Sequence, residues 1–168
     1  MNEDFCIVDY PCEWCGGKVK IVQLPQEDKY QQSMNELIGR IKVLMGGRAA
    51  EEIIFGDVTS GASNDIEKAT SIARKMVKQF GMSKKLGLVK YGESNEQYIG
   101  YGYGEQRDYS NQVAEDIDTE VKDIITQAYD EAKKILNENK QILDKLSKML
   151  LDKEVVEGEE FEGLFKDK

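Results

Sequence analysis

The sequence predicts a mainly α-helical protein with a small β or loop segment at its N-terminus. The chain has 168 residues, of which 40% are hydrophobic and 33% are charged, as is typical of a globular, helix-rich protein. Beyond residue 33, apolar side chains recur every three or four residues, which is the period of an α-helix. Only Lys18–Val22 alternates with the period of a strand. We therefore expect a Cys-containing segment over residues 1–22 and a helical domain over residues 23–168.

The first long helix is expected to begin after Ser33. Glu36 follows at the spacing of a capping box, and Gly56 suits the left-handed position that ends a helix. The pair Gly46-Gly47 interrupts this helix, and each glycine costs about 1 kcal/mol relative to alanine. Two glycines in a helix despite this cost predict that another backbone passes close to this face of the helix.

Further helices follow along the chain. The second is expected to begin near Ser63, with Asn64 or Asp65 as its cap, and to end at Gly81. Its expected core positions are Ile66, Ala69, Ile72, Ala73, Met76, Val77 and Phe80. The third and fourth helices have stripes of Val113, Ile117, Val121, Ile124, Ala128, Ala132 and Ile135, and of Ile142, Leu143, Leu146, Met149 and Leu150. Residues 82–109 are rich in glycine and tyrosine and predict a long, mobile connection.

Composition excludes several classes of function. The chain contains 0 histidines, so Ser-His-Asp and Cys-His catalysis cannot be built from it. A net charge of -9 argues against nucleic-acid binding, which needs clustered Lys and Arg. No apolar run reaches the roughly 18 residues of a transmembrane helix, and no signal-peptide pattern opens the sequence. Because the 3 cysteines are an odd number, we expect a reducing, cytoplasmic location rather than a disulfide framework.

Two motifs carry a resemblance to a known family. Residues 44–56 read LMGGRAAEEIIFG, and residues 59–70 read TSGASNDIEKAT. Both are similar to the peptidase domain of the FtsH family of membrane-anchored, ATP-dependent zinc metalloproteases. Shorter similarities, such as Leu24-Pro25 and Leu86-Gly87, extend the resemblance over roughly residues 22–165.

The resemblance implies a zinc site, an assembly and a substrate class. In that family, a preceding helix bears H-E-x-x-H, whose histidines bind zinc and whose glutamate acts as general base. The third ligand is the aspartate of the S-N-D motif, which is Asp65 here. A carboxylate completing a two-His site leaves a position for the reactive water. The family also implies hexamers, an attached ATPase ring and unfolded proteins as substrates.

This sequence departs from the family pattern where the chemistry lies. It has no histidine, hence no H-E-x-x-H, and no G-x-x-x-x-G-K-S/T motif for ATP. We therefore predict a peptidase scaffold with no catalytic residue, inactive in this chain and acting as a scaffold or interaction module. A homo-oligomer, and an FtsH-type ATPase or another protein as partner, are expected. The alternative is an active metallopeptidase whose missing ligands come from a second chain.

The cysteines offer another metal site. Cys12 and Cys15 form a C-x-x-C followed by two glycines, similar to one knuckle of a zinc ribbon. Cys6 would be a third ligand, and a carboxylate, a water or a second chain would supply the fourth. The same cysteines also fit a redox pair, or reduced side chains with no special role. Paired Glu51 and Glu52 predict one solvated and one salt-bridged side chain rather than a general base.

Overall fold

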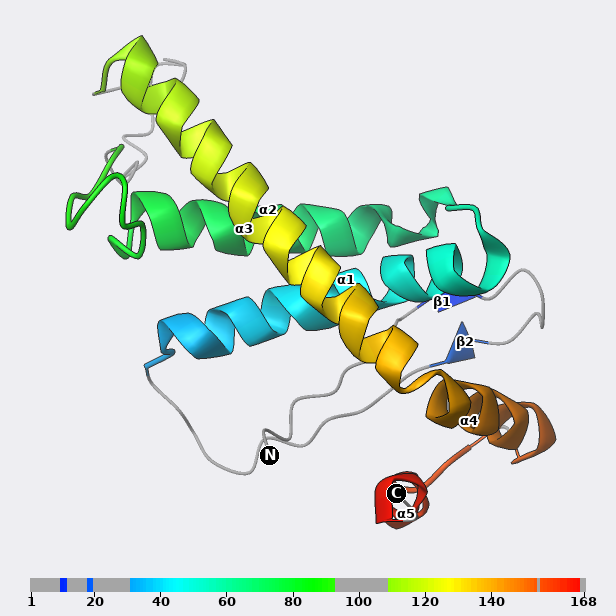
Figure 1. Cartoon of the computed structure of the whole chain (residues 1–168). Coiled ribbons are helices and arrows are strands. Elements are labelled where there is room, and N and C mark those ends of the chain that lie inside the picture. Colours follow the sequence, from blue (N-terminus) through cyan, green and yellow to red (C-terminus); the bar gives the residue numbers. More distant parts are fainter. Residues whose placement is uncertain (1–9, 12–17, 20–30, 93–108, 154, 167–168) are drawn as a thin grey trace, which may run out of the picture.

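Helices make up nearly all of the described protein, which confirms the predicted fold class. The computed structural model describes residues 10–11, 18–19, 31–92, 109–153 and 155–166. Its helices are α1 (Met34–Phe55), α2 (Ser63–Lys78), α3 (Asn111–Glu138), α4 (Lys140–Lys153) and α5 (Gly158–Lys166), with a 3-10 turn, η1 (Ser60–Ala62), before α2. Helices α1 and α2 pack against each other, and α3 runs diagonally across both (Figure 1).

Two short strands precede the helices. Strands β1 (Tyr10–Pro11) and β2 (Lys18–Val19) pair in antiparallel fashion, with Tyr10 opposite Val19 and Pro11 opposite Lys18. The strand predicted over residues 18–22 is thus confirmed at its first two residues, while residues 20–22 lie outside the described part. The C-x-x-C segment falls between the two strands in the sequence.

Both ends of α1 match the sequence prediction. The Ser33 hydroxyl accepts the Glu36 N–H at 3.2 Å, and the Glu36 carboxylate accepts the Ser33 N–H at 2.6 Å. This reciprocal pair is a capping box, and it satisfies N–H groups that have no partner within the helix. At the other end, Gly56 has a φ of 67°, a left-handed conformation that glycine adopts without a Cβ clash.

The hydrophobic core lies where α1, α2 and α3 meet. Ile41 of α1 and Met76 and Val77 of α2 are fully buried, and Ile117, Val121 and Ala128 of α3 pack onto them. Burying one large aliphatic side chain contributes about 1.5–3 kcal/mol. These contacts hold the three helices together. They confirm most of the stripes expected for α2 and α3, but the expected core positions Ile66 and Ile135 are wrong, because these side chains are 41% and 42% exposed.

The Gly46-Gly47 pair lies inside α1. A Cβ built on Gly46 would meet nothing within 4 Å among the described residues. The close approach of another backbone to this pair therefore stays a prediction. The helix continues through both glycines, and Met45 and Ala49 on either side of the pair are buried in the core.

Helix α2 ends earlier than its apolar stripe. It stops at Lys78, and Gly81 follows with a φ of 61°, while the Met82 N–H donates to the Met76 carbonyl at 3.0 Å. The chain therefore leaves the helical path before Phe80, whose side chain is 51% exposed. The core position predicted for Phe80 is wrong, because the helical period does not extend to it.

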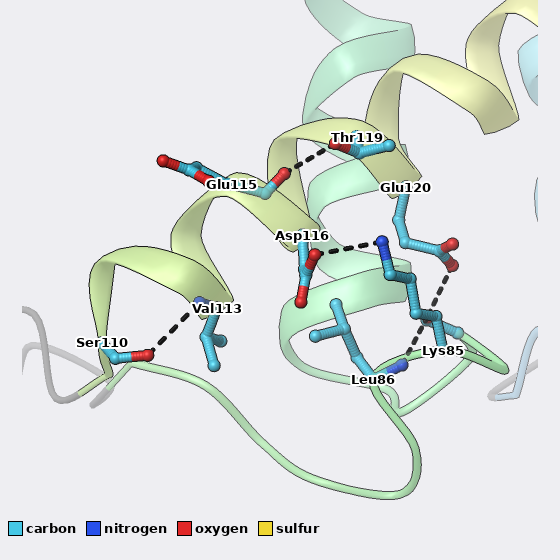
Figure 2. Close-up of polar contacts among 9 residues, drawn as sticks. Lys85, Leu86, Ser110, Val113, Glu115, Asp116, Thr119 and Glu120 are labelled. Carbon is cyan, nitrogen blue, oxygen red and sulfur yellow. Dashed lines mark hydrogen bonds and ion pairs between the residues drawn. The ribbon is translucent and has the colours of Figure 1, made fainter.

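Residues 81–92 are fastened to α3 by polar contacts. The buried Ser83 hydroxyl donates to Glu120 at 2.5 Å and accepts the Leu86 N–H at 3.1 Å. Lys85 pairs with Asp116 at 3.0 Å, and Figure 2 shows its ammonium directed at that face of α3. The Asp116 hydrogen bond and charge raise the pKa of Lys85. Residues 93–108, most of the predicted mobile connection, lie outside the described residues.

The last two helices lie beyond the far end of α3. Figure 1 shows α4 and α5 at a distance from α1 and α2. Leu146 is the buried residue of the predicted α4 stripe. Lys153 binds Glu160 at 2.5 Å and links α4 to α5. Among the helices in the described ranges, none has an apolar stretch that would cross a bilayer.

Candidate functional site

The S-N-D motif opens α2. Asp65 is the third residue of this helix, and its side chain is half-buried. Ala62 occupies the N-cap position, and no side chain caps the helix. The expectation that Asn64 or Asp65 caps α2 is therefore wrong. The physical reason is that η1 runs directly into α2, so the Ser63 N–H already donates to the Ser60 carbonyl.

A set of contacts that we term the Thr59 clamp fixes the chain just before this motif. Arg48 donates from Nη1 to the Thr59 carbonyl at 3.2 Å. Glu51 accepts the Thr59 N–H at 3.1 Å and the Thr59 hydroxyl at 3.0 Å. The Gly61 N–H then donates to the Thr59 hydroxyl oxygen at 3.1 Å. Every polar group of Thr59 is thus bound, and the two side chains that reach it from α1 are Arg48 and Glu51.

The clamp depends on local features of the sequence. Arg48 and Glu51 are three residues apart, so they lie on one face of α1. A Cβ built on Gly61 would lie 3.1 Å from the Thr59 hydroxyl oxygen and 3.7 Å from Glu51 Oε1. A larger residue at this position would therefore crowd the clamp. Sequence reasoning missed these contacts, and the shared face of Arg48 and Glu51 was the available signal.

The Asp65 carboxyl is electrostatically disfavoured in its charged form. Partial removal from water raises its pKa, and the nearby Lys68 ammonium offsets part of that increase. No hydrogen bond joins this carboxyl to another described residue. Partial burial therefore opposes ionisation of this carboxyl, while its place in the first turn of α2 favours a negative charge.

The adjoining Glu52 binds α3 instead of the clamp. It accepts a hydrogen bond from the Tyr129 hydroxyl and pairs with Lys133 at 2.7 Å. The prediction of one salt-bridged glutamate is confirmed, with Lys133 as its cation in place of Arg48. The prediction that the other is solvated is wrong, because Glu51 accepts two hydrogen bonds from Thr59. Glu52 also lines an open groove of about 520 Å³ between α1, α2 and α3. The other lining residues are Met45, Arg48, Gly56, Asp57, Val58, Ile66, Ile125, Thr126 and Tyr129.

Comparison with known proteins identifies the family. The model of peptidase family M41 matches residues 16–164, which is most of the chain. This chain belongs to that family. It is 49% identical over 147 residues to the ATP-dependent zinc metalloprotease FtsH of Thermotoga maritima, covering 87% of this chain and 24% of that relative.

Other FtsH proteins show the same relation to this chain. The ATP-dependent zinc metalloprotease FtsH of Mycobacterium leprae is 50% identical over 145 residues, covering 86% of this chain and 18% of the relative. FtsH of Bacillus subtilis is 45% identical over 145 residues, covering 85% and 23%. The chain thus spans about a quarter or less of the length of these M41 relatives.

The residues present do not fit the zinc that the names of these relatives imply. A closed or catalytic zinc site takes at least three protein ligands. Asp65 is the ligand that the family resemblance assigns to this chain, and the sequence has 0 histidines to join it. Within the described residues, no three His, Cys, Asp or Glu side chains gather closely enough to hold a metal. Asp65 therefore has too few neighbouring ligand-type side chains among the described residues to hold a metal.

The predicted cysteine site cannot be placed. Cys6, Cys12 and Cys15 all lie outside the described residues. In the sequence, the described residues that flank Cys12 and Cys15 are Pro11 and Lys18, which are paired across β1 and β2. The C-x-x-C segment therefore connects two paired strands.

Proposed function

We propose that this chain is a metallopeptidase scaffold that does not cleave peptide bonds by itself and acts as an interaction module. One observation carries the proposal: the sequence contains Asp65 but has 0 histidines. The family resemblance assigns two of its three protein zinc ligands to histidine. With one carboxylate left, zinc and its activated water have no stable position.

The state of Asp65 supports this proposal. Its carboxyl is half-buried and lacks a hydrogen-bond donor among the described residues. Within the described residues, it belongs to no group of three His, Cys, Asp or Glu side chains that could hold a metal. The Thr59 clamp holds the loop that precedes Asp65 on α1 through hydrogen bonds between protein groups.

A cleavage assay tests the proposal. Purified protein is incubated with zinc and labelled casein, alongside the Asp65→Ala variant and the Thermotoga maritima FtsH as a positive control. We expect the chain and its variant to release label at the same background rate. Zinc-dependent release that Asp65→Ala abolishes would overturn the proposal and favour ligands supplied by a second chain.

A cysteine-ligated zinc module is the second candidate function. It is supported by the antiparallel pairing of Pro11 with Lys18, which brackets the C-x-x-C segment. Two thiolates at this spacing grip one zinc ion from a tight turn, with Cys6 as a third ligand. Metal analysis of the parent and of Cys12→Ser tests this function, which requires zinc in the parent and its loss in the variant.

We further propose a homo-oligomer, with an ATPase as partner. The relatives are named ATP-dependent, and three apolar side chains are exposed where α1 leads into α2. Ile54, Phe55 and Ile66 are 43%, 65% and 41% exposed. Neighbouring exposed apolar side chains favour association. Light scattering should give a multiple of 19.1 kDa that falls in Phe55→Asp, whereas a monomeric parent would contradict the proposal.

A further inference from the structure

We propose that two copies of this chain join head to tail, through a basic apolar surface on one copy and an acidic apolar surface on the other. The first surface, the basic tip, lies in the loop after α2. The second, the acidic patch, lies where α4 leads into α5. The inference rests on the homo-oligomer proposed above and names its contact. Figure 1 shows the two surfaces at opposite ends of the molecule, with the loop in green and α5 in red.

The basic tip combines exposed apolar side chains with lysines. Its members are Phe80, Lys84, Leu88, Val89 and Lys90. Leu88 is 94% exposed, and Phe80 and Val89 are 51% and 49% exposed. Lys85 is left out because its ammonium binds α3. The sequence over residues 68–92 contains no aspartate or glutamate, so the tip is locally positive in a chain whose net charge is -9.

The loop holds Leu88 in a fixed place. The Gly87 N–H donates to the Ser83 carbonyl at 3.1 Å. The Tyr91 hydroxyl donates to the Leu86 carbonyl at 3.1 Å. Gly87 has a φ of 73°, a left-handed conformation that turns the chain directly before Leu88. Because the loop is already ordered, docking through Leu88 would cost little further conformational entropy.

The acidic patch has the opposite charge and a similar apolar content. Its members are the exposed side chains of Val155, Glu157, Glu159, Glu162 and Phe165. Val155 and Phe165 are 66% and 40% exposed. Glu160 is left out because Lys153 binds it. The sequence over residues 154–165 contains no lysine or arginine, so the patch is locally negative.

The two surfaces complement each other. Apolar side chains from both gain by leaving water together, and the charges around them have opposite signs. Pairing two basic tips, or two acidic patches, would instead bring like charges together. Charges interact over roughly 8 Å at physiological salt, so the signs at the contact outweigh the net charge of the two copies. Because the surfaces differ and lie at opposite ends, the contact is heterologous, and one copy can use both.

Charge reversal with complementation tests the inference. The tip-reversed variant carries Lys84→Glu and Lys90→Glu, and the patch-reversed variant carries Glu159→Lys and Glu162→Lys. Light scattering over a concentration series gives the mass of the parent, of each variant alone, and of the two variants mixed in equal amounts. Thermal unfolding checks that every variant is folded.

A matched control separates the contact from net charge. Lys122→Glu with Lys134→Glu makes the same charge change as the tip reversal, at exposed positions of α3 away from both surfaces. We expect this control to keep the mass of the parent. A second variant, Leu88→Ser, tests the apolar part of the contact and should lower the mass without changing the charge.

We expect each reversed variant alone to have a lower mass than the parent, and the mixture to recover it. Recovery follows because the negative tip of one variant then meets the positive patch of the other, while the remaining contact keeps its original signs. An oligomeric parent whose mass neither reversal lowers, or a mixture without recovery, overturns this contact and leaves the proposed homo-oligomer standing.

Two further outcomes would also overturn the inference. A parent with the monomer mass of 19.1 kDa at every concentration overturns both this contact and the homo-oligomer. Vesicles of phosphatidylserine and phosphatidylcholine test a lipid surface as the other occupant of the basic tip. A monomeric parent that sediments with these vesicles, and fails to do so as Leu88→Ser, would assign the tip to a membrane. None of these outcomes depends on whether the chain cleaves peptides.

Discussion

The three-helix core and the junction between α1 and α2 are held by different forces. In the core, Ile41, Met76 and Val77 have no exposed side-chain surface, and apolar contacts join all three helices. In the junction, the Thr59 clamp consists of exposed hydrogen bonds between charged side chains and a loop. Burial stabilises the fold in proportion to the apolar area removed from water. Exposed hydrogen bonds add little to the free energy of unfolding and mainly restrict the relative orientation of the groups that they join.

The core and the junction therefore depend on different features of the sequence. The core is built from apolar residues at helical spacing. The junction carries Asp65 in the first turn of α2, shortly after Thr59 in the chain. Substitutions in the core should therefore change unfolding, and substitutions in the junction should change local geometry and charge.

The largest effect is expected in the core. Ile41→Ala removes a side chain that is 0% exposed and should lower the free energy of unfolding by about 2–5 kcal/mol, through lost burial and a cavity. Urea denaturation measures this loss. Leu151→Ala, at a position that is 56% exposed, is the control and should change stability by no more than about 0.5 kcal/mol. Equal effects at both positions would contradict the assigned core.

A smaller effect is expected at the helix starts, where α1 has a side-chain cap and α2 has none. Ser33→Ala breaks the capping box and should cost about 1 kcal/mol. Asn64→Ala should cost less, since no side chain caps α2. Thermal unfolding of both variants checks the ranking, and a larger loss in Asn64→Ala would show that α2 is capped after all.

The ion pair between Glu52 and Lys133 should contribute less to the free energy of unfolding than the capping box does. Their side chains are 38% and 35% exposed, so solvent screens their attraction, and Lys133→Met should cost about 0.2–1 kcal/mol. The loss should shrink as salt is added. Urea denaturation at low and high salt measures it, and a loss that salt does not alter would show that the charge pair is not its cause.

The smallest effect is a gain in stability at Asp65. Burial raises the folded-state pKa of its carboxyl, so the folded protein resists ionisation of this group. The resulting cost is present above the folded pKa and absent below the unfolded pKa. Asp65→Asn should therefore raise Tm at pH 7 and change it little at pH 3. The exposed Asp152→Asn is the control, and a fall in Tm of Asp65→Asn at pH 7 would contradict the desolvation account.

Much of the fold was predictable from spacing, and the junction was not. The stripe from Ile117 to Ala132 has a helical period because one face of α3 packs on two helices. Phe80 shares the α2 period, yet the left-handed Gly81 ends that helix first. The Thr59 clamp joins exposed polar residues eight and eleven positions apart. Contacts of that kind leave no period in a sequence, so only Asp65 itself was identified, through the family resemblance.

Metal analysis tests the central claim most directly. Parent, Asp65→Ala and Cys12→Ser are each loaded with zinc, dialysed against metal-free buffer and assayed for bound zinc per chain. The account predicts that Asp65→Ala retains as much zinc as the parent, because one carboxylate does not hold the ion. One zinc per parent chain that is lost in Asp65→Ala and kept in Cys12→Ser would contradict it.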